Sequence, residues 1–177
     1  MRMTAKVVQE AGFEFALLGL SLNKNQPFEE MSRVANKLAH MDGGHNKFLE
    51  SIVVWMDINA PRYWWQEFDT YRTGMTKQSQ STMHTILKRP LEQSDFNIDI
   101  PFYLLVVLNK FIIEQEFHVL KNLMPEGFLQ RRVVCTNYKT LRNIVKQRKD
   151  HRLPEWNTVF MNCLKLELSY PEWLFDE

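Results

Sequence analysis

The chain has 177 residues and a formal net charge of +1, and 45% of its residues are hydrophobic. A chain of this length can bury a full core, so we predict one globular domain over residues 1–177. The longest apolar run, Phe102–Leu108, is far shorter than the roughly 18 residues that a membrane span needs, and the N-terminus lacks the apolar segment of a signal peptide. We therefore expect a cytoplasmic protein without membrane segments.

The first half of the chain predicts two strands separated by helices. Val7–Val8 is β-branched, and apolar residues then recur at helical spacing over Phe13–Leu22. A second β-branched run, Ser51–Ile58, is followed by Pro61, and proline suits the first position of a helix. Asn59 or Ala60 is expected to cap this third helix, with Pro61 near its first position. The predicted elements are a strand at Val7–Val8, helices over Phe13–Leu22 and Phe28–Met41, a strand over Ser51–Ile58 and a helix ending near Arg72.

The second half predicts loops, a long helix and a strand followed by a capped helix. Residues 73–84 and 93–99 are polar and are expected to be loops. Apolar residues surround the first turns of the long helix, which predicts a helix buried in the domain or in an oligomer. The other expected elements are a helix over Pro101–Met124, a strand over Phe128–Cys135, a helix over Tyr138–Lys149 capped by Asn137, and a last helix from Pro154. Separated strands and long helices favour the α+β class.

Several kinds of active site lack their sequence motifs. The chain has neither the glycine-rich loop of P-loop proteins nor the fingerprint of dinucleotide-binding folds, and no His/Cys spacing suits zinc. Cys135 and Cys163 are far apart in the sequence, and we expect two reduced, partly buried thiols. We predict no metal site.

A basic segment at residues 131–152 points to an anionic partner, either a nucleotide phosphate or a polynucleotide. Only Asp150 opposes its positive charge. A solvated helix surface is the alternative, and we prefer that interpretation for two of the lysines, Lys146 and Lys149. The basic residues are Arg131, Arg132, Lys139, Arg142, Lys146, Arg148, Lys149 and Arg152.

Arginine suits phosphate because its planar fork donates two parallel hydrogen bonds. Arg131 precedes Asn137 on the predicted strand, and Arg148 ends the helix that follows, so these residues and Asn143 could face one ligand. Simpler roles remain open, since Asn137 suits a plain helix cap and Arg148 suits the negative end of a helix dipole. His45 could likewise bind a ligand or a backbone carbonyl.

Glu50 precedes a predicted strand and could pair with one of the basic residues. Tyr63, Trp64 and Trp65 cluster on one helix, where aromatic side chains more often belong to a core or an interface than to a stacking surface.

Two blocks of the sequence together resemble the flavin-dependent thymidylate synthase family. Residues 44–72 follow its order of glycine-histidine, glutamate, strand, Ala-Pro and a helix ending in RHR, which here reads Thr70-Tyr71-Arg72. Residues 124–156 follow its second block, in which Asn137-Tyr138-Lys139-Thr140-Leu141 resembles NARSL. The resemblance covers about residues 5–165 and implies an α+β fold with a mixed or antiparallel sheet and long helices.

The resemblance also implies roles for the matching residues. It implies FAD, NADPH and methylenetetrahydrofolate as cofactors, one-carbon transfer to C5 of dUMP or a related pyrimidine deoxynucleotide, and a homotetramer with shared sites. Arg148 is also the predicted catalytic residue. The implied flavin residues are His45, Glu50, Arg72, Asn137, Lys139 and Asn143, and the implied nucleotide residues are Glu67, Ser81, Arg131 and Arg148.

The chain departs from the family at positions that matter to this chemistry. Met83, or Thr82 without a one-residue shift, replaces an arginine of the loop that cradles the dUMP phosphate. A glutamine that contacts the nucleotide is replaced by Glu67 or displaced to Gln66. A carboxylate accepts hydrogen bonds only, so Glu67 could select a different base. The alternative function is a nucleotide- or nucleic-acid-binding protein that keeps the fold without the catalysis.

Overall fold

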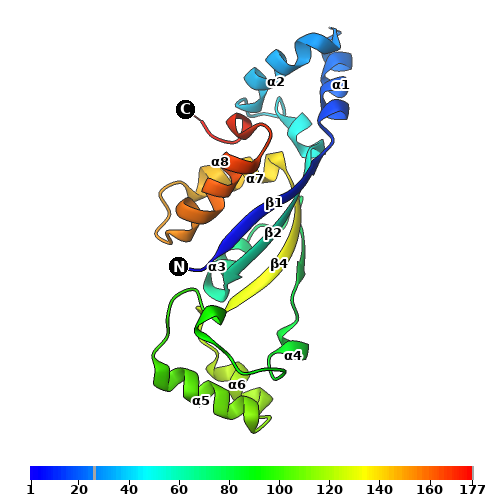
Figure 1. Cartoon of the computed structure of the whole chain (residues 1–177). Coiled ribbons are helices and arrows are strands. Elements are labelled where there is room, and N and C mark those ends of the chain that lie inside the picture. Colours follow the sequence, from blue (N-terminus) through cyan, green and yellow to red (C-terminus); the bar gives the residue numbers. More distant parts are fainter. Residues whose placement is uncertain (26, 177) are drawn as a thin grey trace. The chain divides into compact units, whose positions relative to one another are not determined.

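The computed structural model describes residues 1–25 and 27–176. Four strands form one sheet in the order β1-β2-β4-β3, and neighbouring strands run in opposite directions (Figure 1). The strands are β1 at Thr4–Ala11, β2 at Val53–Pro61, β3 at Thr76–Ser79 and β4 at Leu129–Asn137. The sheet and the helices confirm the α+β class. None of the described helices is long and apolar enough to cross a membrane.

The chain divides into two compact units, and each strand has residues in both. The first unit comprises Met1–Thr4, Ile58–Thr70 and Gln78–Arg132, and the second comprises Ala5–Asp57, Tyr71–Lys77 and Val133–Glu177. The single domain stays a prediction.

The first unit contains four helices and an apolar core. Phe96, Leu108 and Leu120 are fully buried in this core, and Trp64 stacks on Phe68 with ring centroids 4.9 Å apart. Trp64 and Trp65 are therefore core residues, as the simpler interpretation of their cluster predicted. The helices are α3 at Arg62–Phe68, α4 at Thr82–Thr85, α5 at Phe102–Ile113 and α6 at Phe117–Leu123, with a 3-10 turn at Gln93–Asp95.

The second unit packs its helices around aromatic side chains. Trp173 is fully buried against Phe13, Phe48 and Tyr138, with ring centroids 5.5–6.2 Å apart. The helices are α1 at Phe13–Lys24, α2 at Met31–Ala39, α7 at Tyr138–Arg148, a π-helix at Trp156–Met161 and α8 at Asn162–Glu167. Short 3-10 turns lie at Phe28–Glu30, Lys47–Ser51 and Pro171–Trp173.

The residue before α1 has to be glycine, which is Gly12 here. Its φ is +101°, and a Cβ atom there would lie 2.4 Å from the carbonyl oxygen of Ser51. Any other residue would be strained and would collide with backbone.

The predictions around β2 and β3 were partly wrong. β2 starts at Val53 because Lys47–Ser51 forms a 3-10 turn, and it runs through Asn59 and Ala60 to Pro61, so Pro61 precedes α3 and neither Asn59 nor Ala60 caps it. The predicted loop over 73–84 contains β3 and α4. Backbone pairing with a neighbouring strand can impose β structure on a polar segment that has no apolar alternation of its own.

The predicted helix over Pro101–Met124 is two helices. α5 ends in a Schellman motif, in which Glu116 N–H bonds to the carbonyl of Phe111 and Gln115 N–H to that of Ile112, and Gln115 has a φ of +57°. The prediction that α5 is buried on all sides was also wrong for the single chain, because the side chains of Phe102, Tyr103 and Ile113 are 72–77% exposed. Burial in an oligomer stays open.

Candidate functional site

The N-terminus of α7 is built on Asn137, which ends β4. Its Oδ1 accepts a hydrogen bond from Thr140 N–H at 2.9 Å, as the cap interpretation predicted. This cap uses the side-chain oxygen, so Nδ2 is the atom that can donate to a ligand. Four predicted site residues, Asn137, Lys139, Asn143 and Arg148, therefore belong to the end of β4 and to one helix.

Gly74, which sequence reasoning missed, brings the segment after Tyr71 to this helix. Thr136 Oγ1 donates to the Gly74 carbonyl at 3.1 Å, and Thr140 Oγ1 donates to that of Thr73 at 3.2 Å. Gly74 has a φ of +66°, and a Cβ atom would lie 2.7 Å from Thr140 Oγ1 and 2.8 Å from Asn137 Nδ2. Backbone thus approaches the Asn137 amide closely, which only glycine permits.

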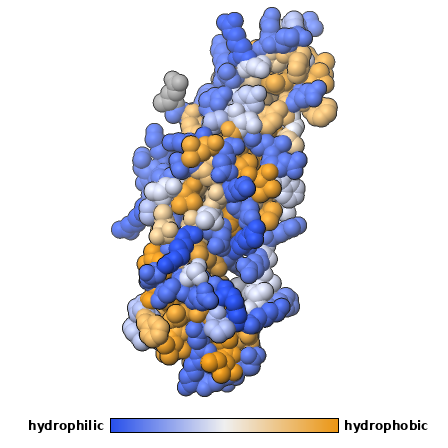
Figure 2. All heavy atoms as spheres, in the orientation of Figure 1, coloured by the Kyte–Doolittle hydropathy of each residue, from blue (hydrophilic) through white to orange (hydrophobic). Residues whose placement is uncertain are grey.

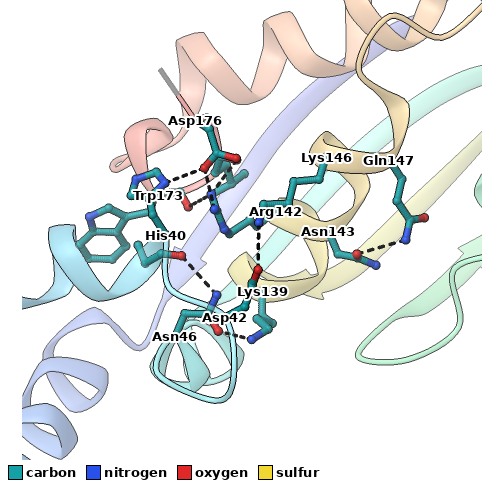
Figure 3. Close-up of polar contacts among 12 residues, drawn as sticks. His40, Asp42, Asn46, Lys139, Arg142, Asn143, Lys146, Gln147, Trp173 and Asp176 are labelled. Atoms are coloured by element: carbon teal, nitrogen blue, oxygen red, sulfur yellow. Dashed lines mark hydrogen bonds and ion pairs between the residues drawn. The ribbon is translucent and has the colours of Figure 1, made fainter.

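Lys139 reaches from α7 to Asn46, the residue directly after His45. Its ammonium donates to Asn46 Oδ1, and Asn46 Nδ2 donates to the carbonyl of Ala39 at 3.2 Å (Figure 3). Asn46 is 1% exposed. It is a second residue that sequence reasoning missed, since a short polar side chain beside two glycines is typical of an ordinary turn.

His45 is exposed at the rim of a pocket of about 460 Å³ within the second unit. Phe15, Leu20 and Phe48 form part of its apolar wall, and Lys47 adds a charge. A pocket of this size with an apolar wall and few polar groups suits an aromatic ring system. Glu50 is exposed on the neighbouring 3-10 turn, and Arg72 is exposed after Tyr71.

Arg148 is held in a defined orientation at the end of α7. Its Nε donates to the Tyr71 hydroxyl at 2.8 Å, and its Nη1 lies 2.9 Å from His151 Nε2. The guanidinium carbon lies 4.8 Å from the centre of the Trp156 ring, which is cation–π distance. Tyr71 stands where the family has the histidine of RHR. No sequence signal predicts its contact with Arg148, because the two residues are 77 positions apart.

Two arginines of the basic segment stabilise the fold. Arg142 is only 3% exposed and donates to the carbonyls of Trp173 and Leu174 and to Asp176 Oδ1. In the first unit, Arg132 pairs with both carboxylate oxygens of Asp69 at 3.0 Å and lies 4.3 Å over the Trp65 ring. The interpretation of the whole segment as an anion-binding surface was therefore too broad.

Two lysines of the basic segment lie at the surface, unlike Arg142 and Arg132. Lys146 and Lys149 are both exposed, as we expected for solvated side chains, and Lys146 lies 3.6 Å from Asp42. Asn143 is also exposed, and its Oδ1 accepts from Gln147 Nε2 at 3.2 Å (Figure 3).

The remaining predicted nucleotide residues belong to the first unit. Ser81 precedes α4 and is exposed, Glu67 is half-buried on α3, and Arg131 is exposed on β4, where its carbonyl accepts from Gln80 N–H at 2.9 Å. Seven of the predicted residues lie in the second unit: His45, Glu50, Arg72, Asn137, Lys139, Asn143 and Arg148. Their roles stay predictions.

No protein-family model and no curated protein matches this sequence. Solved structures do match. A structure of thymidylate synthase X (ThyX) from Helicobacter pylori with FAD and dUMP is similar over 98% of this chain and 97% of its own, with a TM-score of 0.77 and 15% identity. A second structure of flavin-dependent ThyX from the same organism, also with FAD and dUMP, has a TM-score of 0.77 and 14% identity over 97% of each chain. The chain therefore has the flavin-dependent thymidylate synthase fold, as the resemblance predicted.

Proposed function

We propose that this chain is a divergent flavin-dependent thymidylate synthase homologue. It binds FAD and a pyrimidine deoxynucleotide, dUMP or a related base, and transfers one carbon from methylenetetrahydrofolate to C5 of that base, with NADPH as the reductant. The observation that carries the proposal is the held guanidinium of Arg148, at the position where the resemblance expects a nucleotide-binding arginine, in a chain that shares the fold of ThyX.

Arg148 suits a phosphate or a pyrimidine carbonyl. Tyr71 and Trp156 fix the plane of its guanidinium before any ligand arrives, so binding costs little rotamer entropy. In the proposed reaction Arg148 holds the nucleotide and stabilises negative charge as it develops on the base. This role is positional and electrostatic, and it needs no covalent nucleophile from the protein.

The second unit also has residues that fit a flavin. The pocket beside His45 has an apolar wall suited to a ring system, and Lys139 beside Asn46 offers a cation for a phosphate or ring oxygen. Asn137 Nδ2, which takes no part in the helix cap, offers a hydrogen-bond donor to the ligand. His45, Arg72, Asn137 and Lys139 would hold the flavin, which when bound supplies the hydride chemistry.

The test begins with the cofactor. Purified protein should be yellow, or it should quench the fluorescence of added FAD, and dUMP binding should follow by calorimetry. A colourless protein that binds no FAD at micromolar concentration would contradict the flavin proposal. Complementation of a thymidine auxotroph then separates an enzyme from a protein that binds the nucleotide without turning it over.

One observation favours that non-catalytic alternative. Residues 78–84 contain no lysine or arginine, whereas the resemblance expects a loop arginine there. A nucleic-acid-binding function has less support, because Arg132 and Arg142 already pair with Asp69 and Asp176. Polynucleotide binding would weaken by decades as salt rises, whereas binding of a mononucleotide would weaken far less.

A homotetramer with shared sites is part of the proposal. Apolar side chains gather on the surface over α1 and over α5 (Figure 2), and Phe15, Leu22, Phe102 and Ile113 are each at least 75% exposed. Apolar patches of this kind mark protein interfaces. Light scattering at micromolar concentration should give the mass of an oligomer, and a monomer would contradict shared sites.

A further inference from the structure

Lys121 of α6 reaches the turn that begins α4. Its Nζ donates to Thr82 Oγ1 at 2.8 Å, and both residues are half-buried in the first unit. Thr82 follows Ser81, and together they form the hydroxyl-bearing turn of the segment 78–84. A hydroxyl that accepts from a lysine keeps its own hydrogen to donate. The Ser81 side chain makes no cap hydrogen bond, so it can donate as well.

Within the described part of the chain, Lys121 pairs with no carboxylate. The charge that acts on it is the positive charge of Arg62, the first residue of α3, and the pKa of Lys121 is lowered by burial first and by Arg62 second. Arg62 has its own partner, Glu126, at 3.5 Å. A partly buried ammonium beside a second cation is unfavourable unless an anion joins it.

We infer that Lys121 supplies the cation for a phosphate monoester bound at the Ser81–Thr82 turn. The inference rests on the proposed function, in which the ligand is the 5′-phosphate of the deoxynucleotide. The segment 78–84 has no basic side chain except His84, so the positive charge has to come from another element. Lys121 lies on α6, about 40 positions further along the chain, and its ammonium provides this charge. The hydroxyls of Ser81 and Thr82 beside it add two hydrogen-bond donors for the phosphate.

The first experiment compares dUMP with deoxyuridine, which lacks the phosphate, by calorimetry. Lys121→Met should weaken dUMP binding roughly tenfold to a hundredfold and leave deoxyuridine binding unchanged. Lys121→Arg should keep most of the dUMP affinity. The matched control is Lys110→Met on α5, because Lys110 is 66% exposed and lies 3.8 Å from Glu114. Lys121→Met with unchanged dUMP affinity would overturn the inference and leave the proposed function standing.

A second experiment needs no nucleotide. Lysine acetylation is followed by mass spectrometry in the wild-type protein with and without inorganic phosphate. Phosphate should protect Lys121 severalfold more than Lys110. Equal protection of the two lysines would overturn the inference even if dUMP binds. Protection of Lys121 in a protein that binds neither FAD nor dUMP would uphold the phosphate site and contradict the proposed function.

Discussion

Arg142 and Asp176 form an ion pair that fastens the C-terminal segment to α7, with Arg142 Nη2 2.7 Å from Asp176 Oδ1. The same guanidinium donates to the carbonyls of Trp173 and Leu174, both at 3.2 Å. His40, which follows α2, contacts the same carboxylate oxygen, with its Nδ1 2.8 Å from Asp176 Oδ1 (Figure 3). One carboxylate thus links α2, α7 and the C-terminal segment.

Asp176 should make stability depend on pH in the acid range. Hydrogen bonds from His40 and then Arg142 lower its pKa to about 2, whereas an aspartate in the unfolded chain has a pKa of about 3.9. A lowered pKa contributes stability that is complete above about pH 4 and is lost as the pH falls towards 2. The Asp176 side chain is 55% exposed, so the contribution is discounted for solvent screening to roughly 1 kcal/mol.

Urea unfolding of Asp176→Asn at several pH values measures this contribution. The variant should be less stable near neutral pH and should lose less stability than the wild type on acidification. Asp42→Asn is the control, because the Asp42 side chain is 79% exposed in its contact with Lys146. Parallel acid profiles for wild type and Asp176→Asn would contradict the prediction.

Arg142→Ala should destabilise the fold far more than Lys146→Ala on the same helix. The arginine side chain is 3% exposed and donates hydrogen bonds to two buried carbonyls and a carboxylate. Its loss should therefore lower the free energy of unfolding by about 3 kcal/mol. The exposed lysine should cost under about 1 kcal/mol. Thermal or urea unfolding of both variants gives the comparison, and similar losses would mean that Arg142 is not a structural residue.

Arg148→Ala should weaken pyrimidine nucleotide binding more than Lys149→Ala. A guanidinium held by Tyr71 and Trp156 is worth roughly 1.5–3 kcal/mol to a charged ligand, whereas an exposed lysine is worth under about 1. Tyr71→Phe keeps the ring but removes the hydroxyl, so its effect should lie between the two. Calorimetry with dUMP and dCMP measures all three. Equal, small effects at positions 148 and 149 would show that the nucleotide site lies elsewhere.

Arg72→Ala should weaken FAD binding and affect dUMP binding less. Arg72 is exposed and forms no hydrogen bond or ion pair with the described residues, so the substitution should leave the free energy of unfolding within about 0.5 kcal/mol of the wild type. Calorimetry with each ligand, beside an unfolding curve, checks both statements. A large loss of stability would indicate a structural role instead.

Local chemistry made part of this structure predictable. Asn137 predicted the start of α7, because an N-cap needs only its own helix. The break after α5 was not predictable, since its left-handed position carries Gln115 rather than glycine. The structural role of Arg142 could not be predicted either, because its partner Asp176 lies 34 positions away in the sequence.

The π-helix that starts at Trp156 has a consequence for insertions and deletions. A π-helical turn corresponds to one residue added to an α-helix. Deleting one residue between 157 and 161 would let the backbone return to α-helical hydrogen bonding and would keep α8 at about the same rotation relative to Trp156. The indole could then stay over the Arg148 guanidinium while Leu164 stays buried. An added residue has no such compensation and would rotate α8 by about 100°, so this helix should tolerate a deletion better than an insertion.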